Sequence, residues 1–473
     1  MTAGDLIIEG CAIATVDEYG TEYRRGHIVV SDGRIAAVGP GPAPAAPHTA
    51  TPGASAPARI DGSHCLATPG LVNTHHHLYQ WIFRGLAQNE TLFGWLTELY
   101  PRWARIDEDA VRAAARAGLA WLALSGCTTS SDHHYLFPRG RGDLLGATID
   151  AARLVGLRFD PSRGSMDRGR SAGGLPPDAV VEDIDAILAA SQDAIDRFHD
   201  PAPGALTRIA LAPCSPFSVS SELMTESAAL ARANGVRLHT HLAETADEEE
   251  FCVARHGRTP AEYADSLGWL GPDVWLAHCV HLNEAAVKRL AATGTGTAHC
   301  PSSNARLGSG LAPVKDLLDA GAPVGLGVDG PASQESGMLV EELRSALYLS
   351  RLKAGSPSTH RALDARAALR LGTIGGARLL GRADEIGSLE PGKCADIALW
   401  GLDGLGHADI DDPVAALVLG PPAPLRLLTV QGRPVVEEGV LCNADTGQLA
   451  RDARAAAKRM AEGHHAAAEG SRT

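Results

Sequence analysis

The chain has 473 residues, of which 45% are hydrophobic and 21% are charged, and this is the composition of a globular protein rather than a disordered one. A formal net charge of −14 argues against nucleic acid as a partner, because contacts with phosphates require a basic surface. No apolar run approaches the roughly 18 residues of a membrane-spanning helix, so no membrane is expected as a partner. The start of the chain lacks the pattern of a signal peptide and the nine cysteines are scattered, which predicts a cytoplasmic protein with reduced thiols.

The two ends of the chain share a pattern of short strands. Residues 5–39 alternate β-rich runs with turns, and Asp32-Gly33 is typical of a hairpin between two of them. The same pattern of short β-rich runs returns after residue 385, where the segment 431–440 is similar to the segment 31–38. These runs predict one small β-sandwich domain built from residues 1–65 and 385–445, followed by a C-terminal helix and tail over 446–473.

Residues 66–384 alternate short apolar runs with helical stretches rich in alanine and leucine. Strands separated by helices predict a parallel sheet, and roughly eight such units over this length favour a (β/α)8 barrel of the TIM type over an open doubly wound sheet. The carboxyl ends of all strands in such a barrel lie on one face, where active sites assemble. We therefore predict an α/β fold in which residues at strand ends meet.

Two of the apolar runs end in an H-x-H pattern. Leu71-Val72 leads to His75 and His77, and alternate residues of a strand point to the same side, so both imidazoles are able to share one metal ion. A second run leads to His239 and His241, and Glu244 follows three residues later, where a carboxylate reaches metal-bound water without coordinating. The alternative for each pair is an ordinary polar residue that lines the barrel.

Two further runs end on single residues of the same chemical kind. Trp275-Leu-Ala leads to His278, and Gly325-Leu-Gly-Val leads to Asp329. A lone histidine or aspartate at a strand end is usually a cap or a hydrogen-bonding group. Four such ends on one face of a barrel instead indicate a metal-dependent active site.

The order of these motifs resembles the metal-dependent amidohydrolase superfamily, specifically its aminohydrolase branch. The stretches that carry the resemblance are P-G-L-V-N-T-H-H-H, H-T-H-L-A-E-T, H-C-P-S-S-N and G-V-D-G, and it extends over nearly the whole chain. Within that branch the chain looks most like the 8-oxoguanine deaminases and, more distantly, like the s-triazine hydrolases. The closer resemblance is carried by His75–Gln80, Trp95–Arg105, Ser125–Thr129, Asp132–Pro138 and Ala212–Val219.

The resemblance implies one divalent metal, Zn2+ or alternatively Fe2+, held by His75, His77, His241 and Asp329. It implies Glu244, His278 and Asp329 as the catalytic residues, of which Glu244 and His278 do not coordinate. Relatives with two metals bridge them by a carboxylated lysine, and this chain has no lysine before Lys288, which favours one metal. The implied reaction is hydrolytic deamination of an aminated purine-like heterocycle, with 8-oxoguanine converted to urate and ammonia.

Contacts with the substrate are predicted from single residues. Gln80 offers an amide to the polar edge of a purine, or is an amide without that role; Trp95 offers a ring for stacking, or belongs to the core. One of His133 and His134 is expected to face the pocket, and Asn304 is expected to shape a loop. The segments 331–335 and 164–174, the latter with Arg168 and Arg170, depart from close relatives and bear on specificity.

Other functions stay open from the sequence alone. The same site is able to displace an alkylamine or chloride from an s-triazine or a related heterocycle, and barrels of this superfamily also occur as proteins without catalysis. Gly169-Arg-Ser-Ala-Gly173 matches the G-x-S-x-G of serine hydrolases, but the strand and helix that should flank Ser171 directly are missing from the pattern. A homo-oligomer is expected because it is the commonest assembly of soluble proteins.

Overall fold

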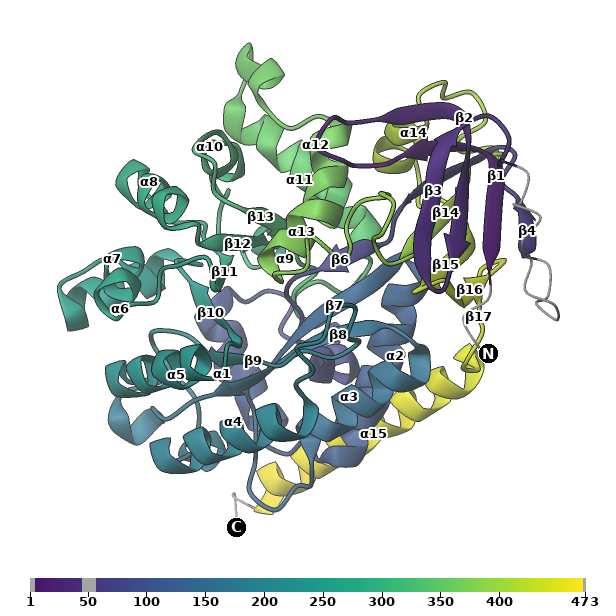
Figure 1. Ribbon diagram of the computed structural model, residues 1–473. Coiled ribbons are helices and arrows are strands. Elements are labelled where there is room, and N and C mark those ends of the chain that lie inside the picture. Colours follow the sequence, from purple (N-terminus) through teal and green to yellow (C-terminus); the bar gives the residue numbers. More distant parts are fainter. Residues whose placement is uncertain (1–4, 45–56, 471–473) are drawn as a thin grey trace.

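The computed structural model describes residues 5–44 and 57–470. Figure 1 shows a barrel surrounded by helices, a β-sheet against one side of it, and a long C-terminal helix across the outside. Residues 1–4, which bear on the prediction about a signal peptide, and the last three residues of the predicted tail lie outside the described ranges. Within those ranges no helix combines the length and the apolar character that crossing a bilayer requires.

Eight parallel strands close into a barrel, and Leu326 of the last strand pairs with Asn73 of the first. Every residue of these strands is buried except Arg237, so the apolar runs of the sequence are the barrel strands. In barrel order the strands are β6 (Leu71–Asn73), β7 (Cys127–His134), β8 (Arg158–Ser165), β9 (Ala210–Pro213), β10 (Arg237–Leu242), β11 (Val274–His278), β12 (Gly296–His299) and β13 (Val324–Leu326).

Helices follow each strand and cover the outside of the barrel. Several begin at a capping side chain: Asp107, Asp143, Ser220 and Asn283 each accept a hydrogen bond from a backbone N–H of the first helical turn. The longer helices of this layer are α1 (Leu92–Trp103), α2 (Glu108–Leu124), α3 (Leu144–Val155), α4 (Ile184–Phe198), α5 (Ser221–Ala233), α6 (Ala246–His256), α8 (Glu284–Thr293) and α11 (Leu339–Ala354). The shorter ones are α7 (Pro260–Ser266), α9 (Pro301–Arg306), α10 (Val314–Asp319), α12 (Ala365–Arg370) and α13 (Gly376–Leu379), with the 3-10 helices η1 (Leu78–Phe83), η2 (Arg170–Ala172), η3 (Asp178–Val180) and η4 (Ser358–Arg361) and the π-helical turn η5 (Leu371–Gly375).

The second sheet joins the two ends of the chain. Its strands are β1 (Leu6–Ala14), β2 (Glu22–Ser31), β3 (Arg34–Pro40), β4 (Ala58–Asp61), β5 (Cys65–Pro69), β14 (Ile397–Gly401), β15 (Leu425–Val430), β16 (Arg433–Glu437) and β17 (Val440–Leu441). The early strand β5 pairs antiparallel with the late strand β14, so both ends of the chain are needed to complete the sheet. Two helices come late in the chain, α14 (Pro413–Leu419) and α15 (Thr446–Gly470).

The predicted α/β architecture, a barrel with a small β domain from both chain ends, is confirmed. The β domain is a single hydrogen-bonded sheet of nine strands, and the division of the chain at residues 65, 385 and 445 stays a prediction. The sheet meets the barrel at Gly126, which has a φ of +86° and where a Cβ would lie 2.0 Å from the ring of Trp400. Because Gly126 directly precedes β7, the sheet packs beside the start of that strand and leaves the carboxyl ends of the barrel strands for the site.

Candidate active site

The predicted site residues lie at or just beyond the carboxyl ends of four barrel strands. His75 and His77 follow β6, His241 lies in β10 with Glu244 two residues after that strand, His278 ends β11, and Asp329 follows β13. His278 and Asp329 have φ angles of 71° and 64°. This left-handed conformation is uncommon for residues other than glycine, and strained backbone of this kind is enriched at active sites.

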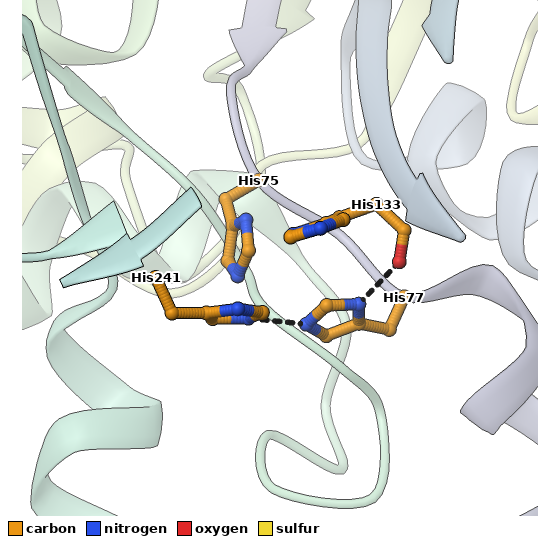
Figure 2. A group of neighbouring side chains, drawn as sticks. All are labelled: His75, His77, His133 and His241. Atoms are coloured by element: carbon orange, nitrogen blue, oxygen red, sulfur yellow. Dashed lines mark hydrogen bonds between the residues drawn. The ribbon is translucent and has the colours of Figure 1, made fainter. Parts of the chain in front are cut away.

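Two overlapping groups of possible metal ligands lie at this end of the barrel. Figure 2 shows the first group, the imidazole rings of His75, His77, His133 and His241, and the second consists of His75, His278 and Asp329. Nε2 of His77 lies 3.0 Å from Nε2 of His241, and Oδ1 of Asp329 lies 3.3 Å from Nε2 of both His75 and His77. Atoms bound at about 2.0–2.1 Å to one tetrahedral ion are about 3.3 Å apart. These separations therefore suit a single divalent metal.

The hydrogen bonds behind the imidazoles show that a cation belongs between them. Nδ1 of His77 lies 2.7 Å from the carbonyl oxygen of His133, and Nδ1 of His241 lies 2.6 Å from that of Cys214. A carbonyl oxygen only accepts, so each Nδ1 carries a proton and each Nε2 of the neutral ring presents a lone pair. Burial lowers the pKa of both histidines, which keeps the rings neutral. Two such lone pairs 3.0 Å apart repel each other without a cation, so the residues fit a metal.

Two serine hydroxyls orient Asp329. Ser303 Oγ donates to Oδ2 of Asp329 at 2.6 Å, and Ser333 Oγ lies 3.3 Å from the same oxygen. The hydroxyls thereby hold Oδ2 on one side and leave Oδ1 facing His75 and His77.

Glu244 and His278 form a second pair beside the metal-binding atoms. Nε2 of His278 lies 3.6 Å from Oε2 of Glu244 and 4.0 Å from Oδ2 of Asp329, while its Nδ1–H donates to Oδ1 of Asn304 at 2.9 Å. Burial raises the pKa of Glu244 to about 7, so this carboxyl takes up and releases a proton near neutral pH. Burial opposes the charged form of His278, but the neighbouring carboxylates of Glu244 and Asp329 outweigh it and raise the pKa of the imidazole.

The two histidines at the end of β7 have different surroundings, and neither is among the residues that line the cavity over the site. His133 belongs to the same group of possible metal ligands as His75, His77 and His241. Its ring centroid lies 4.7 Å from that of His241, and its Nε2 lies 2.9 Å from the carbonyl oxygen of Ala212. The backbone carbonyl of His133 holds His77. Nε2 of His134 instead lies 2.9 Å from the carbonyl oxygen of Leu136.

A small cavity lies over these groups, and every residue that lines it is buried. α1 covers it with four side chains, and the remaining wall comes from the barrel strands and the loops after them. Trp95 lies in this wall, and its Nε1–H donates to the carbonyl oxygen of Ala332 at 3.1 Å. Gln80 also lines the cavity, and its Oε1 has no hydrogen-bond partner among the described residues. The other lining residues include Leu92, Leu96, Tyr100, Tyr135, Cys214, Ser215, Phe217 and Leu307.

The two segments that depart from close relatives differ in their distance from the cavity. In 331–335, Ser333 lines the cavity, whereas Gln334 and Glu335 bond to Glu342 and Arg306 outside it. Neither Arg168 nor Arg170 is among the residues that line it. Ser171 lies in the exposed turn η2, and its hydroxyl donates to Asp178 at 2.9 Å, which does not match the strand–turn–helix of a serine nucleophile.

Sequence reasoning missed Ser303 and gave Asn304 only a part in shaping a loop. Both residues lie in α9, the short helix after β12, so the rule that strand ends meet on one face would have placed them near the site. Asn304 does more than shape a loop, since it holds His278. No sequence pattern indicates the part played by the carbonyl oxygens of His133 and Cys214, because it depends on the fold and not on side-chain type.

Comparisons with known proteins identify the family of the chain. Residues 66–435 match the amidohydrolase family. The chain is 46% identical to an 8-oxoguanine deaminase of Pseudomonas aeruginosa, over 93% of this chain and 95% of that one. It is 37% identical to a hydroxydechloroatrazine ethylaminohydrolase of Pseudomonas sp. (strain ADP), over 95% and 94%. It superposes on the crystal structure of an atrazine chlorohydrolase from Arthrobacter aurescens complexed with zinc, with a TM-score of 0.89 at 34% identity over 96% of this chain and 100% of that one. The chain therefore belongs to the amidohydrolase family and is a metal-dependent hydrolase that acts on carbon–nitrogen bonds.

Proposed function

We propose that the protein is a hydrolytic deaminase of an aminated purine-like base, and that its substrate is 8-oxoguanine, which it converts to urate and ammonia. The observation that carries the proposal is the buried carboxyl of Glu244, which faces the same cavity as the metal-binding atoms and has a pKa of about 7. Such a group is suited to carry a proton between water and a leaving amine. The 46% identity to an 8-oxoguanine deaminase supports the choice of substrate.

We assign the metal to His75, His77, His241 and Asp329. When bound there, it supplies the acidification of water that hydrolysis at neutral pH requires. Three imidazoles and a carboxylate suit Zn2+, with Fe2+ as the alternative, and the related chlorohydrolase was crystallised with zinc. Metal analysis of the protein purified without added metal tests the assignment, and a non-catalytic barrel would retain less than about half an ion per chain.

The proton steps are assigned to three residues. His278 Nε2 and Asp329 Oδ2, 4.0 Å apart, orient the attacking water and receive its proton. Protonated Glu244 gives its proton to the ring nitrogen of the substrate as a carbon–oxygen bond forms to the attacking water. The hydroxyl proton of that water then passes through Glu244 to the amine as the carbon–nitrogen bond breaks, so ammonia leaves and a carbonyl remains. The first proton of the water, held by His278 and Asp329, returns to Glu244 and restores the starting state.

We place the substrate between Gln80 and Trp95. The unpartnered Oε1 of Gln80 is a buried acceptor, which requires an N–H on the edge of the heterocycle that faces it. Trp95, fixed through Ala332, offers an aromatic surface to a planar ring. The partners of the protein are then water and a small heterocycle; the absence of nucleic-acid partners, a homo-oligomer and a cytoplasmic location stay predictions.

The second candidate is hydrolysis of a substituted s-triazine, with loss of an alkylamine or chloride. The similarity in sequence and structure to the ethylaminohydrolase and the chlorohydrolase supports it. A screen of ammonia, alkylamine and chloride release distinguishes the two, over 8-oxoguanine, guanine, isocytosine, pterins and aminotriazines, with and without a chelator. We expect chelator-sensitive ammonia release with the highest kcat/KM on 8-oxoguanine. Turnover of triazines alone would overturn the proposal.

A further inference from the structure

The three imidazoles of the metal site are oriented by different kinds of partner. His77 and His241 are each held by a backbone carbonyl, as described above, and no side-chain substitution removes a carbonyl. His75 differs, because its Nδ1 lies 2.8 Å from Nε2 of another histidine, His239. The orientation of His75 therefore depends on a replaceable side chain.

The direction of the hydrogen bonds that run from His75 through His239 to Trp275 is determined at Trp275. Nδ1 of His239 lies 2.8 Å from the carbonyl oxygen of Trp275, which only accepts, so this Nδ1 carries the proton. Nε2 of neutral His239 is then an acceptor, and Nδ1 of His75 must donate to it. His75 is left with a lone pair on Nε2, the atom that lies 3.3 Å from Oδ1 of Asp329.

His239 is itself held rigidly. Its ring stacks on the indole of Trp275, with centroids 4.4 Å apart and planes inclined by 13°. The Nε1–H of Trp275 donates to the carbonyl oxygen of Thr74, the residue before His75, at 3.0 Å. One tryptophan thus supports both His239 and the main chain that carries His75, and all of these residues are buried.

We propose that His239 is a positioning residue that selects the tautomer of His75, so that Nε2 is available to the metal, and that it thereby sets the metal affinity of the site. Without an acceptor at position 239, the Nδ1–H of His75 is buried and unpaired. Moving the proton to Nε2 relieves this cost and removes the lone pair that faces the metal. The inference rests on the metal site and not on the identity of the substrate.

Metal affinity tests the proposal directly. We expect His239→Leu to weaken Zn2+ binding about 10- to 100-fold, measured by competition with a chromogenic chelator at fixed pH. His239→Gln has an amide oxygen to accept from His75 and an amide N–H to donate to Trp275, so it should bind within about threefold of the wild type. This rescue separates positioning from simple packing.

His299→Leu is the matched control. His299 is a buried histidine at the end of β12, and within the described residues its ring has no hydrogen bond to a metal-binding group. The His299→Leu variant should lose stability, measured as Tm, as His239→Leu does, but it should keep the metal affinity of the wild type. Equal weakening of Zn2+ binding in both leucine variants, or unchanged binding in His239→Leu, overturns the proposal.

A spectroscopic measurement covers the case in which His239→Leu does not fold. In the wild-type protein labelled with 15N-histidine and stripped of metal, NMR should show His75 protonated at Nδ1, and His239→Gln should preserve this. A proton on Nε2 of His75 in the wild type contradicts the proposal. Neither measurement uses a substrate, so a negative substrate screen leaves this result unaffected.

Discussion

The two ends of the barrel bury their charged and polar groups differently. At the end where the strands begin, Arg158 and Arg382 are buried against carboxylates. At the end where the strands finish, three imidazoles and a carboxylate are buried against one another. Arg158 Nη2 lies 3.2 Å from Oδ2 of Asp396, and Arg382 Nη2 lies 2.6 Å from Oδ1 of Asp160. Both guanidiniums also donate to the carbonyl oxygen of Ala205. At the other end, the lone pairs of His77 and His241 face each other at 3.0 Å. One end of the barrel satisfies its own charges, and the other requires a cation from outside.

The largest expected effect comes from removing a metal-binding atom. Asp329→Ala or His241→Ala should lower the affinity for Zn2+ by at least about 100-fold and abolish turnover, because the remaining atoms no longer surround the ion. Metal content after gel filtration measures the loss. Asp396→Asn, at the other end of the barrel, should keep its metal. Full metal occupancy in both site variants would contradict the assignment.

The next effect separates catalysis from metal binding. Glu244→Gln keeps the shape of the side chain and removes the proton that it carries, so kcat should fall by about 10^2–10^4 while metal content stays at the level of the wild type. Steady-state kinetics and metal analysis on one preparation give both quantities. Deamination at the wild-type rate would show that another group moves the proton.

A substitution at the end of the barrel that pairs its own charges should lower the stability of the protein instead. Asp396→Asn leaves Arg158 buried beside a neutral amide, and breaking a buried ion pair costs about 3–5 kcal/mol of the free energy of unfolding. The side chains of this pair are 0% and 2% exposed. Asp265→Asn is the matched control, since the side chains of the Arg289–Asp265 pair are 54% and 36% exposed and loss of this pair should cost much less stability. Equal losses in denaturant unfolding would show that burial does not govern these pairs.

The same contrast explains how far the sequence predicts the molecule. Apolar runs that end on His241, His278 and Asp329 predict both the strands and their meeting point, because strand direction and burial are properties of local sequence. The contacts of His75 with His239 and of His278 with Asn304 depend on rotamers and on neighbours from other strands, which local patterns do not specify. The ion pair of Arg158 and Asp396 joins the barrel to the sheet across 238 positions, and no pattern near either residue indicates it.

Asp132 provides the test with the smallest expected effect on the comparison of the two barrel ends. It is a carboxyl near the site without a cationic partner among the described residues. Its Oδ1 accepts the N–H of Leu78 at 2.7 Å, at the start of the helix that carries Gln80, and its Oδ2 has no partner among the described residues. Burial raises the pKa of Asp132 to about 7, above the value of about 3.9 in the unfolded chain. Its contribution to stability is therefore complete below pH 4 and is lost as the pH rises through 7.

Asp132→Asn keeps an acceptor for Leu78 and removes the ionisation. Relative to the wild type, the variant should gain about 3 kcal/mol in the free energy of unfolding between pH 5 and pH 8, because only the wild type must hold a buried charge at the higher pH. Urea unfolding of both proteins at constant metal concentration measures this difference. The contributions of the other titrating groups are the same in both proteins and cancel. If the two stability curves stay parallel over this range, Asp132 is already compensated in the folded protein, and the end of the barrel that binds the metal is less dependent on an external cation than its lone pairs indicate.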